Sequence, residues 1–403
     1  MFNTPSCNSF SEQGINDMTL QADRGRYLPL IILALVAALV GVIFLWSVDR
    51  AAIEVDVSHQ SAGAADSGRQ YHWKIVTTWP KNLPGLGTAA ENFSQMVDQL
   101  SNGRLTARVY GAGEIVPAFE VFDAVSQGVA DAGHGAAYYW KGKVPSSVFF
   151  TAVPFGMTAQ EMNGWLHQGG GLELWQEAYA PFNLLPMTGG STGVQMAGWF
   201  NKEINSIDDL KGLKMRIPGL AGEVFAEAGG TAVRIPGGEL YTSLQTGVID
   251  AGEWVGPYND LALGLHEVAE YYYYPGWHEP GAMLEFIVNK DAYDALPADL
   301  QAVVTVASRA ANQMMLDEYT ARNNAALRQL VDEHGVKLRR LPDDVIIALA
   351  RSSDRVMQNL VARDPMSAKI YASFKAFYDD VRAYHHISEQ AYINARDLAF
   401  DEE

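Results

Sequence analysis

Two stretches of this 403-residue chain decide its fold: EVFDAVSQGVADAG, residues 120–133, and ELYTSLQTGVIDAG, residues 239–252. They are identical at six of fourteen positions, and apolar residues replace one another at four more, at a constant offset of 119 residues. Any amphipathic helix with a glycine cap before a strand shows this periodicity, but not the shared glutamate and the shared Asp-Ala-Gly. The match therefore predicts an internal duplication.

The surroundings of the two stretches repeat as well. In the first copy, strand signals over 73–79 and 104–110 flank a helical stretch over 88–100. In the second copy, LKMRIP (213–218) and TAVRIP (231–236) flank another helical stretch. Two α/β lobes of the same kind follow, each a three-layer open sheet. Such sheets bind ligands beyond the carboxyl ends of their strands, so the lobes should face each other across a cleft.

The rest of the folded body is predicted to be helical. Apolar residues keep helical spacing over 296–335, which predicts one long helix that ends near a glycine. A last helical stretch, 366–397, is unusually aromatic for a chain end and should pack on its own lobe or on a partner subunit.

The expected domain division follows from this order of elements. Residues 71–195 form mainly the first lobe, 196–285 mainly the second, and 286–403 a crossing strand, the long helix and the C-terminal helices, which are a possible dimerisation element.

The amino-terminal segment has a different character. Residues 27–46 contain twenty residues without a charge, enough to cross a bilayer, and basic residues just before them favour a cytoplasmic head over 1–26. This predicts a transmembrane anchor or uncleaved signal, and a cleaved secretory signal is the alternative. Residues 47–70 are small and polar and are predicted to be a flexible linker.

Composition excludes several classes of protein. Hydrophobic residues make up 48% and charged residues 19%, as in a folded globular protein. The net charge of −18 makes nucleic acid an unsuitable partner. The single cysteine, Cys7, rules out an intramolecular disulfide, and it precedes the membrane-type segment. No serine-hydrolase, zinc-protease, Walker or dinucleotide motif occurs, so we expect a protein that is not an enzyme.

Arg216 is the strongest candidate for a binding residue. It stands at the end of an expected strand, directly before Pro218 and the next helix. A guanidinium pairs a carboxylate bidentately, and a helix N-terminus adds positively polarised N–H groups. The alternative is a surface salt bridge with Asp208 or Asp209, which are close in sequence.

Glu253 and Trp254 follow the third strand of the second copy and should lie on the same rim as Arg216. The carboxylate of Glu253 is either the partner of the arginine or an oxygen ligand for a cation. Together with Gln195 and Glu279 it offers oxygens that suit Na⁺ or Ca²⁺ better than zinc.

Several motifs together resemble a known family. STGVQMAGWFNKEI, DDLKGLKMRIPG, GEWVGPYNDLALGLH and YYYYPGWHEPG are similar to the solute-binding receptors of TRAP transporters, the DctP-like family, and among these to the receptors for 2-oxo acids. The resemblance extends from about residue 73 to the mid-300s. It implies a two-lobed α/β fold of the periplasmic-binding-protein type II with a long backbone helix. The implied function is binding of a small 2-oxo-monocarboxylate such as pyruvate and its delivery to a permease with a small and a large membrane subunit.

The resemblance also implies roles for individual residues. Arg216 matches the arginine that holds the substrate carboxylate. A cation, Na⁺ or alternatively Ca²⁺, bridges substrate and protein, and its ligands are the side chains of Gln195, Glu253 and Glu279 with the backbone of Trp254.

Two further assignments concern the cleft. Tyr139 or Trp140, just beyond the third strand of the first copy, should close the pocket from the other lobe, and Asn259 could bond the keto oxygen. Gln195 and Trp254 are expected to contact the substrate as well as the cation.

The resemblance leaves some alternatives open. The receptor could bind lactate, a dicarboxylate or an aromatic acid, or the chain could be a membrane-tethered ligand sensor. The family implies a homodimer that exchanges C-terminal helices and a periplasmic location. The retained membrane segment departs from the family pattern and predicts a receptor tethered to the inner membrane.

Overall fold

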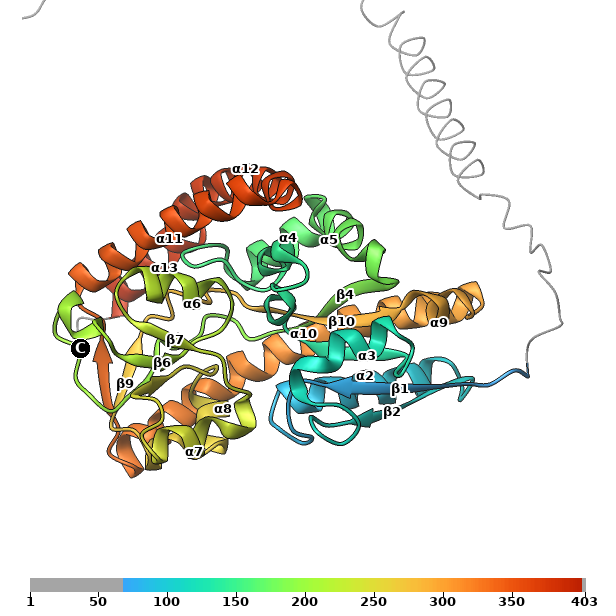
Figure 1. Cartoon of the computed structure of the whole chain (residues 1–403), viewed down its shortest axis with the longest axis horizontal. Helices are drawn as coiled ribbons and strands as arrows, with labels where there is room; N and C mark the ends of the chain where they lie inside the picture. Colours follow the sequence, from blue (N-terminus) through green and yellow to red (C-terminus); the bar gives the residue numbers. More distant parts are fainter. Residues whose placement is uncertain (1–67, 401–403) are drawn as a thin grey trace, which may run out of the picture. The chain divides into compact units, whose positions relative to one another are not determined.

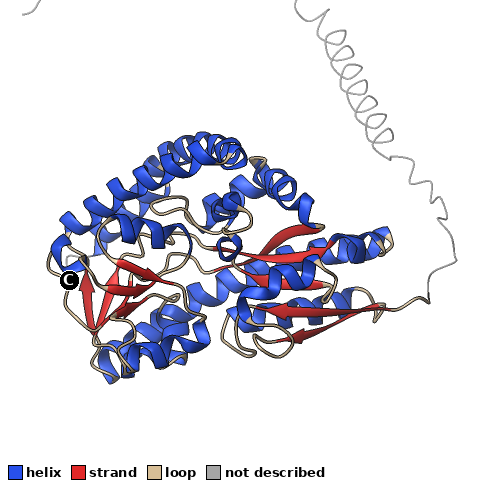
Figure 2. Cartoon of the chain, in the orientation of Figure 1, coloured by secondary structure: helices blue, strands red, loops and turns tan. Residues whose placement is uncertain are grey.

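The computed structural model describes residues 68–400 and places two mixed sheets in them (Figures 1 and 2). Sheet A has the strand order β2-β1-β3-β10-β4, and sheet B has the order β11-β9-β5-β8-β6-β7. The strands of sheet A are β1 (Tyr71–Thr77), β2 (Leu105–Tyr110), β3 (Ala132–Gly135), β4 (Leu184–Ser191) and β10 (Met283–Asn289). The strands of sheet B are β5 (Gly198–Phe200), β6 (Lys214–Arg216), β7 (Thr231–Val233), β8 (Ala251–Gly252), β9 (Tyr271–Tyr274) and β11 (Lys337–Arg340).

The parallel parts of the two sheets have the same topology. β1 lies between β2 and β3, and β6 lies between β7 and β8, with every one of these pairs parallel. An antiparallel strand then follows the third strand in each sheet, β10 beside β3 and β5 beside β8. The duplication predicted from the sequence is therefore present in the fold.

Two short crossings connect the sheets, over residues 192–197 and 275–282, and a third, longer connection over 290–336 leads from β10 of sheet A to β11 of sheet B. The two crossing segments run beside each other, because the N–H of Thr192 donates to the carbonyl of Ala282 at 3.1 Å and the N–H of Gln195 to that of Glu279 at 3.1 Å. Residues from the two crossings therefore meet between the sheets.

Helices cover both faces of sheet A. Trp73 and Ile75 of β1 belong to a core with Phe93 of α2, whereas Val76, on the opposite face, belongs to a core with Phe122 of α3. Alternate residues of a strand point to opposite faces, so the apolar run of β1 is buried on both sides. The helices are α2 (Leu86–Leu100), α3 (Val121–Ser126), α4 (Ala159–Gln168), α5 (Gly171–Tyr179), α6 (Gly219–Glu227), α7 (Leu240–Gln245), α8 (Pro257–Ala262), α9 (Lys290–Asp294), α10 (Ala298–Arg328), α11 (Asp343–Arg363), α12 (Pro365–Ile387) and α13 (Glu389–Phe400).

The long helix predicted over 296–335 is α10, and it reaches both halves of the body (Figure 1). It packs on β4 and α2 on the side of sheet A and on α8 on the side of sheet B. The regular α-helix ends at Arg328, earlier than expected, and a wider turn over Gln329–Glu333 leads to Gly335 in the left-handed conformation, φ 67°. A glycine there ends the helix without strain.

The C-terminal helices are separated by identifiable signals. Asp364 accepts the N–H of Ser367 at 2.7 Å, and Pro365 fills the first turn of α12, so that helix begins sharply. A break at Ser388 divides the expected tail helix into α12 and α13.

The predicted head, membrane segment and most of the linker lie outside the described residues. Within residues 68–400, no helix combines the length and the apolarity that a membrane span requires.

Candidate functional site

The candidate site lies where strands of the two sheets end. Arg216 is the last residue of β6, and Glu253 directly follows its parallel neighbour β8. From the side of sheet A, a short 3₁₀ segment, η2 (Ala137–Trp140), follows β3 and brings tyrosines toward them. Both sets of residues therefore lie at the carboxyl ends of parallel strands, as predicted.

Arg216 is 1% exposed, and its donors are aimed at several neighbours. Nη1 donates to the side chain of Glu253 at 2.5 Å and to its backbone carbonyl at 2.9 Å, and Nη2 donates to the hydroxyl of Tyr139 at 3.3 Å. The guanidinium carbon lies 5.0 Å from the ring centroid of Trp254, a cation–π arrangement. Burial by itself lowers the pKa of Arg216, but the pull of Glu253 and the other acidic groups outweighs it, so the pKa is raised and the charge is permanent.

The alternative of a surface salt bridge for Arg216 is wrong. Asp208 pairs with Lys211, and Asp209 accepts the N–H groups of Asn205 and Ser206. Both aspartates belong to an exposed turn, whereas Arg216 is buried.

Glu253 is one of three buried residues that bring metal-ligand atoms together. One ligand atom from each of Glu253, His278 and Glu279 lies within 4.8 Å of the other two. His278 Nε2 is 3.3 Å from Glu253 Oε2. Burial and the neighbouring Glu253 raise the pKa of Glu279 well above its ordinary value. A carboxyl group in that situation favours either a proton or a bound cation.

Two buried oxygens at this place accept no hydrogen bond from any described residue, Gln195 Oε1 and Glu279 Oε1. Gln195 Nε2 donates to Glu279 Oε2 at 2.7 Å, which fixes both side chains. Buried polar atoms without a partner are rare. The surplus of oxygen atoms fits a hard cation such as Na⁺ or Ca²⁺.

A small cavity of ≈ 20 Å³ lies between these side chains, large enough for about one water molecule. Its lining comes from both halves of the body: Trp79, Leu86, Ala136, Tyr138, Tyr139, Thr192, Gln195, Arg216, Trp254, Val255, Glu279 and Leu284. The structure thus brings Arg216, Gln195, Tyr139, Trp254 and Glu279 together around one space.

Asn259 is not brought to this cavity. Its Nδ2 donates to the carbonyl of Pro84 at 2.6 Å, and its Oδ1 accepts from Tyr319 at 3.1 Å and from Trp254 Nε1 at 3.2 Å. With these bonds Asn259 holds the Trp254 indole in place.

Of the pair Tyr139 and Trp140, the tyrosine lines the cavity. Trp140 points away and donates from Nε1 to Glu285 of β10, which also accepts from Tyr179 at 3.0 Å. Burial raises the pKa of Glu285 to about 8. Glu285 therefore holds η2 in place from the side that faces away from the cavity.

Sequence reasoning missed Tyr138, His278 and Asp260. His278 stands beside Glu279 in the GWHEPG motif, so its position was a usable signal. Asp260 is buried and accepts the N–H groups of Val255 and Gly256, both at 3.2 Å, and so supports the loop that carries Trp254.

Comparison with known proteins identifies the family. The model of the DctP family, "Bacterial extracellular solute-binding protein, family 7", matches residues 75–364. The "Monocarboxylate 2-oxoacid-binding periplasmic protein all3028" of Nostoc sp. is 44% identical over 322 residues, which are 80% of this chain and 88% of that protein.

Two solved structures are similar over most of the chain. A TRAP periplasmic solute-binding protein from Pseudoalteromonas atlantica T6c, with bound sodium and pyruvate, is 47% identical with a TM-score of 0.79, covering 81% of this chain and 99% of that one. A TRAP transporter solute-binding protein from Bordetella bronchiseptica RB50, a mixed-occupancy dimer with calcium and picolinate in one active site, is 37% identical with a TM-score of 0.81, covering 82% and 98%.

These matches confirm the resemblance noted in the sequence and the two-lobed type II fold that it implied. They are matches to binding proteins and not to enzymes, as the lack of a catalytic motif led us to expect. The chain belongs to the DctP family of bacterial extracellular solute-binding proteins, family 7.

Proposed function

We propose that this chain is the extracytoplasmic receptor of a TRAP-type secondary transporter and that it binds a small 2-oxo-monocarboxylate such as pyruvate. The observation that carries the proposal is Arg216, a permanently charged and buried guanidinium in the wall of a cavity between the two sheets. The names of the Nostoc protein and of the Pseudoalteromonas structure support the ligand class.

The residues divide the work by charge. Arg216 holds the ligand carboxylate, and Tyr139 and Trp254 limit the space around it. Na⁺, or alternatively Ca²⁺, would be held by Gln195, Glu253 and Glu279 with the backbone of Trp254, and it would supply a second positive charge for the ligand's oxygens. Arg216 and Na⁺ carry two positive charges against the three negative charges of the ligand, Glu253 and Glu279, and Ca²⁺ in place of Na⁺ would balance them, so little net charge stays buried.

Binding requires the two halves to separate. The cavity holds about one water molecule, which is too little for a keto acid. The crossings over 192–197 and 275–282 are the connections at which the lobes, mainly 71–195 and 196–285, can hinge. Tyr139 reaches from one lobe to Arg216 in the other, so a bound ligand makes contacts with both lobes and favours closure.

Calorimetry tests this function directly. We expect binding of pyruvate and other 2-oxo acids when Na⁺ or Ca²⁺ is present and much weaker binding after the cation is removed. Arg216→Lys keeps the charge but loses the planar fork, so we expect affinity to fall by about a hundredfold or more. A lack of binding by wild-type protein to every carboxylate in the panel would refute the proposal.

Aromatic acids are the second candidate ligands, and a specific observation favours testing them. The Bordetella relative holds picolinate, and the cavity here is lined by Trp79, Trp254 and Tyr138. The same calorimetric panel, extended to picolinate, lactate and dicarboxylates, decides between the classes by their relative affinities.

Location and transport partners form a further part of the proposal. We infer a periplasmic receptor, tethered by residues 27–46, that delivers its ligand to the small and large membrane subunits of a permease. A short tether keeps the local concentration of receptor at a permease high. Fractionation of cells should find the full-length chain in the inner-membrane fraction, and a shorter soluble chain would contradict the tether.

The C-terminal helices support a homodimer. On α13, Leu398 and Phe400 are each 78% exposed and Tyr392 is 68% exposed. A second copy that exchanges this helix would cover them, and the Bordetella relative is a dimer. Light scattering of the double variant Leu398→Ser/Phe400→Ser should show a monomer where the wild type shows a dimer.

A further inference from the structure

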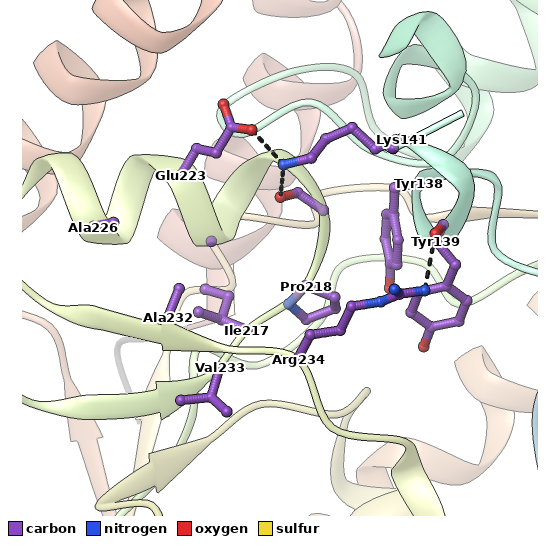
Figure 3. Close-up of a pocket in the computed structure, with 13 residues that line it drawn as sticks. Tyr138, Tyr139, Lys141, Ile217, Pro218, Glu223, Ala226, Ala232, Val233 and Arg234 are labelled. Atoms are coloured by element: carbon purple, nitrogen blue, oxygen red, sulfur yellow. Dashed lines mark hydrogen bonds and ion pairs between the residues drawn. The ribbon is translucent and has the colours of Figure 1, made fainter. Parts of the chain in front are cut away.

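A second and larger cavity adjoins the first. It measures ≈ 450 Å³, and its lining includes Tyr138 and Tyr139 (Figure 3). Both tyrosines also line the smaller cavity, so η2 forms the wall between the two. The remaining walls are residues beyond the end of β6, the start of α6 and the end of β7. We call this space the outer cavity.

Arg234 is the cation of the outer cavity that lacks an acidic partner. It follows β7 directly, and Figure 3 shows its guanidinium reaching toward Tyr139. Nη2 donates to the Tyr139 carbonyl at 3.0 Å, and the guanidinium carbon lies 3.8 Å from the Phe119 ring centroid. Among residues 68–400 it forms no ion pair, and Glu120 acts on it only from a distance. Partial desolvation lowers the pKa of Arg234, but the residue is exposed, so its guanidinium is open to an approaching anion.

The other charges of the outer cavity cancel. Lys141 of one wall pairs with Glu223 of α6, and it also donates to the carbonyl of Gly219 at 3.4 Å. Arg234 therefore leaves the outer cavity with one uncompensated positive charge, in a chain whose net charge is −18. That overall charge repels an approaching carboxylate, so a local positive charge beside the inner cavity favours its encounter with the protein.

Tyr139 lies between two arginines. Arg234 holds its backbone carbonyl from the outer cavity, and Arg216 holds its hydroxyl at 3.3 Å from the inner one. Arg234 lines only the outer cavity and Arg216 only the inner one. A carboxylate that moves from one guanidinium to the other passes Tyr139, which together with Tyr138 lines both cavities.

We propose that Arg234 forms an outer docking site, which binds the carboxylate of the incoming organic acid before the acid passes Tyr139 and reaches Arg216. This inference rests on the proposed function and adds a second binding site and an entry route to it. Arg234 then governs the rate of association, whereas Arg216 governs the lifetime of the complex.

Stopped-flow kinetics with pyruvate test the outer site. The concentration of Na⁺ is kept fixed and the ionic strength is varied with choline chloride. For Arg234→Gln at low ionic strength we expect the association rate constant to fall by about threefold to tenfold, with an unchanged dissociation rate constant. The difference from wild type should shrink at high salt, where charges are screened.

The matched control is Arg328→Gln, which removes the same charge from an exposed position at the end of α10 and should leave both rate constants as in the wild type. An unchanged association rate in Arg234→Gln overturns the outer site. A faster dissociation as the main effect overturns it too, because Arg234 would then act only by positioning Tyr139. Failure of wild-type protein to bind any carboxylate would instead refute the proposed function.

A second measurement detects the outer site itself. In the Arg216→Met background the inner site has lost its positive charge and its hydrogen-bond donors, and saturation-transfer NMR on the pyruvate methyl group should still report weak binding. That signal should disappear in Arg216→Met/Arg234→Gln. Absence of the signal in the single variant, or its persistence in the double variant, contradicts the proposal.

Discussion

Arg216 and Glu253 form a buried ion pair at the ends of two adjacent parallel strands. Nη1 of the arginine donates to both the side chain and the main-chain carbonyl of Glu253. The backbone N–H of Glu253 in turn donates to the Arg216 carbonyl at 3.1 Å. Backbone pairing thus fixes the two side chains relative to each other before any ligand arrives. Such preorganisation lowers the cost of ordering the site when it binds.

The pair predicts a non-additive effect on stability. Glu253→Gln leaves a buried guanidinium without its counter-ion, and we expect it to lower the free energy of unfolding by about 3–5 kcal/mol. Arg216→Met/Glu253→Gln removes both charges and should recover a large part of that loss, as measured by urea unfolding at neutral pH. Additive losses in the double variant would show that the charges do not interact. In folded Glu253→Gln protein, the affinity for pyruvate should also depend less on the cation.

A substitution at Gly237 tests whether the position of the Trp254 indole matters for ligand binding. A Cβ at Gly237 would lie 2.0 Å from the Trp254 indole, whereas a Cβ at the adjacent Gly238 would meet nothing closer than 3.9 Å. We expect Gly237→Ala to displace the indole and to weaken ligand binding by about tenfold, a cost of 1.4 kcal/mol. Gly238→Ala is the matched control and should bind normally. Equal affinity of the two variants would mean that the indole does not shape the site.

Glu285 predicts a pH dependence of stability. Its pKa is about 8 in the folded protein, well above the ordinary value of 4.5, because it is buried. Between these two values the native state holds a proton that the unfolded state has released, so stability is full at low pH and falls as pH rises toward 8. Glu285→Gln should remove this fall and be more stable than wild type above pH 8, with thermal unfolding across pH as the measurement.

The matched control for Glu285 is Glu177→Gln. Glu177 is an exposed glutamate that pairs with Lys369, so its replacement should leave the slope of stability against pH as it is in the wild type. An identical slope in wild type and Glu285→Gln would contradict the assigned role of Glu285.

We expect a substitution of Asp260, which does not line the cavity, to lower the stability of the protein strongly. It accepts from Trp199 at 2.9 Å and Tyr272 at 2.7 Å as well as from two backbone N–H groups. Asp260→Asn replaces one accepting oxygen by a donor, so we expect a loss of about 2–4 kcal/mol in unfolding free energy. Asp344→Asn, at an exposed aspartate that accepts one backbone N–H at 3.2 Å, is the control and should change stability by about 0.5 kcal/mol or less.

The parts of the site that were predictable are those fixed by local pattern. Arg216 and Glu253 stand at strand ends within a repeated sequence, and strand ends in open α/β sheets are where ligands bind. Gln195 and Glu279 were predicted from their oxygen chemistry and from the family resemblance, and the structure places them on one cavity with Arg216.

The remaining contacts depend on partners that are distant in sequence. Glu285 lies within the largely apolar strand β10, and its donors Trp140 and Tyr179 come from two earlier segments, so no local pattern could reveal the group. Asn259 was expected to face the ligand, but its hydrogen bonds to Pro84 and Tyr319 turn it elsewhere. The division of the tail at Ser388 likewise has no strong signal in the sequence.

The strand order of sheet A also bears on how the polypeptide is made. β3 needs β10 as its neighbour, yet a long stretch of chain separates Gly135 from Met283. Until the ribosome has produced β10, one edge of β3 has no backbone partner, and sheet A remains incomplete. A polypeptide arranged in this way cannot complete sheet A until most of its 403 residues have been synthesised.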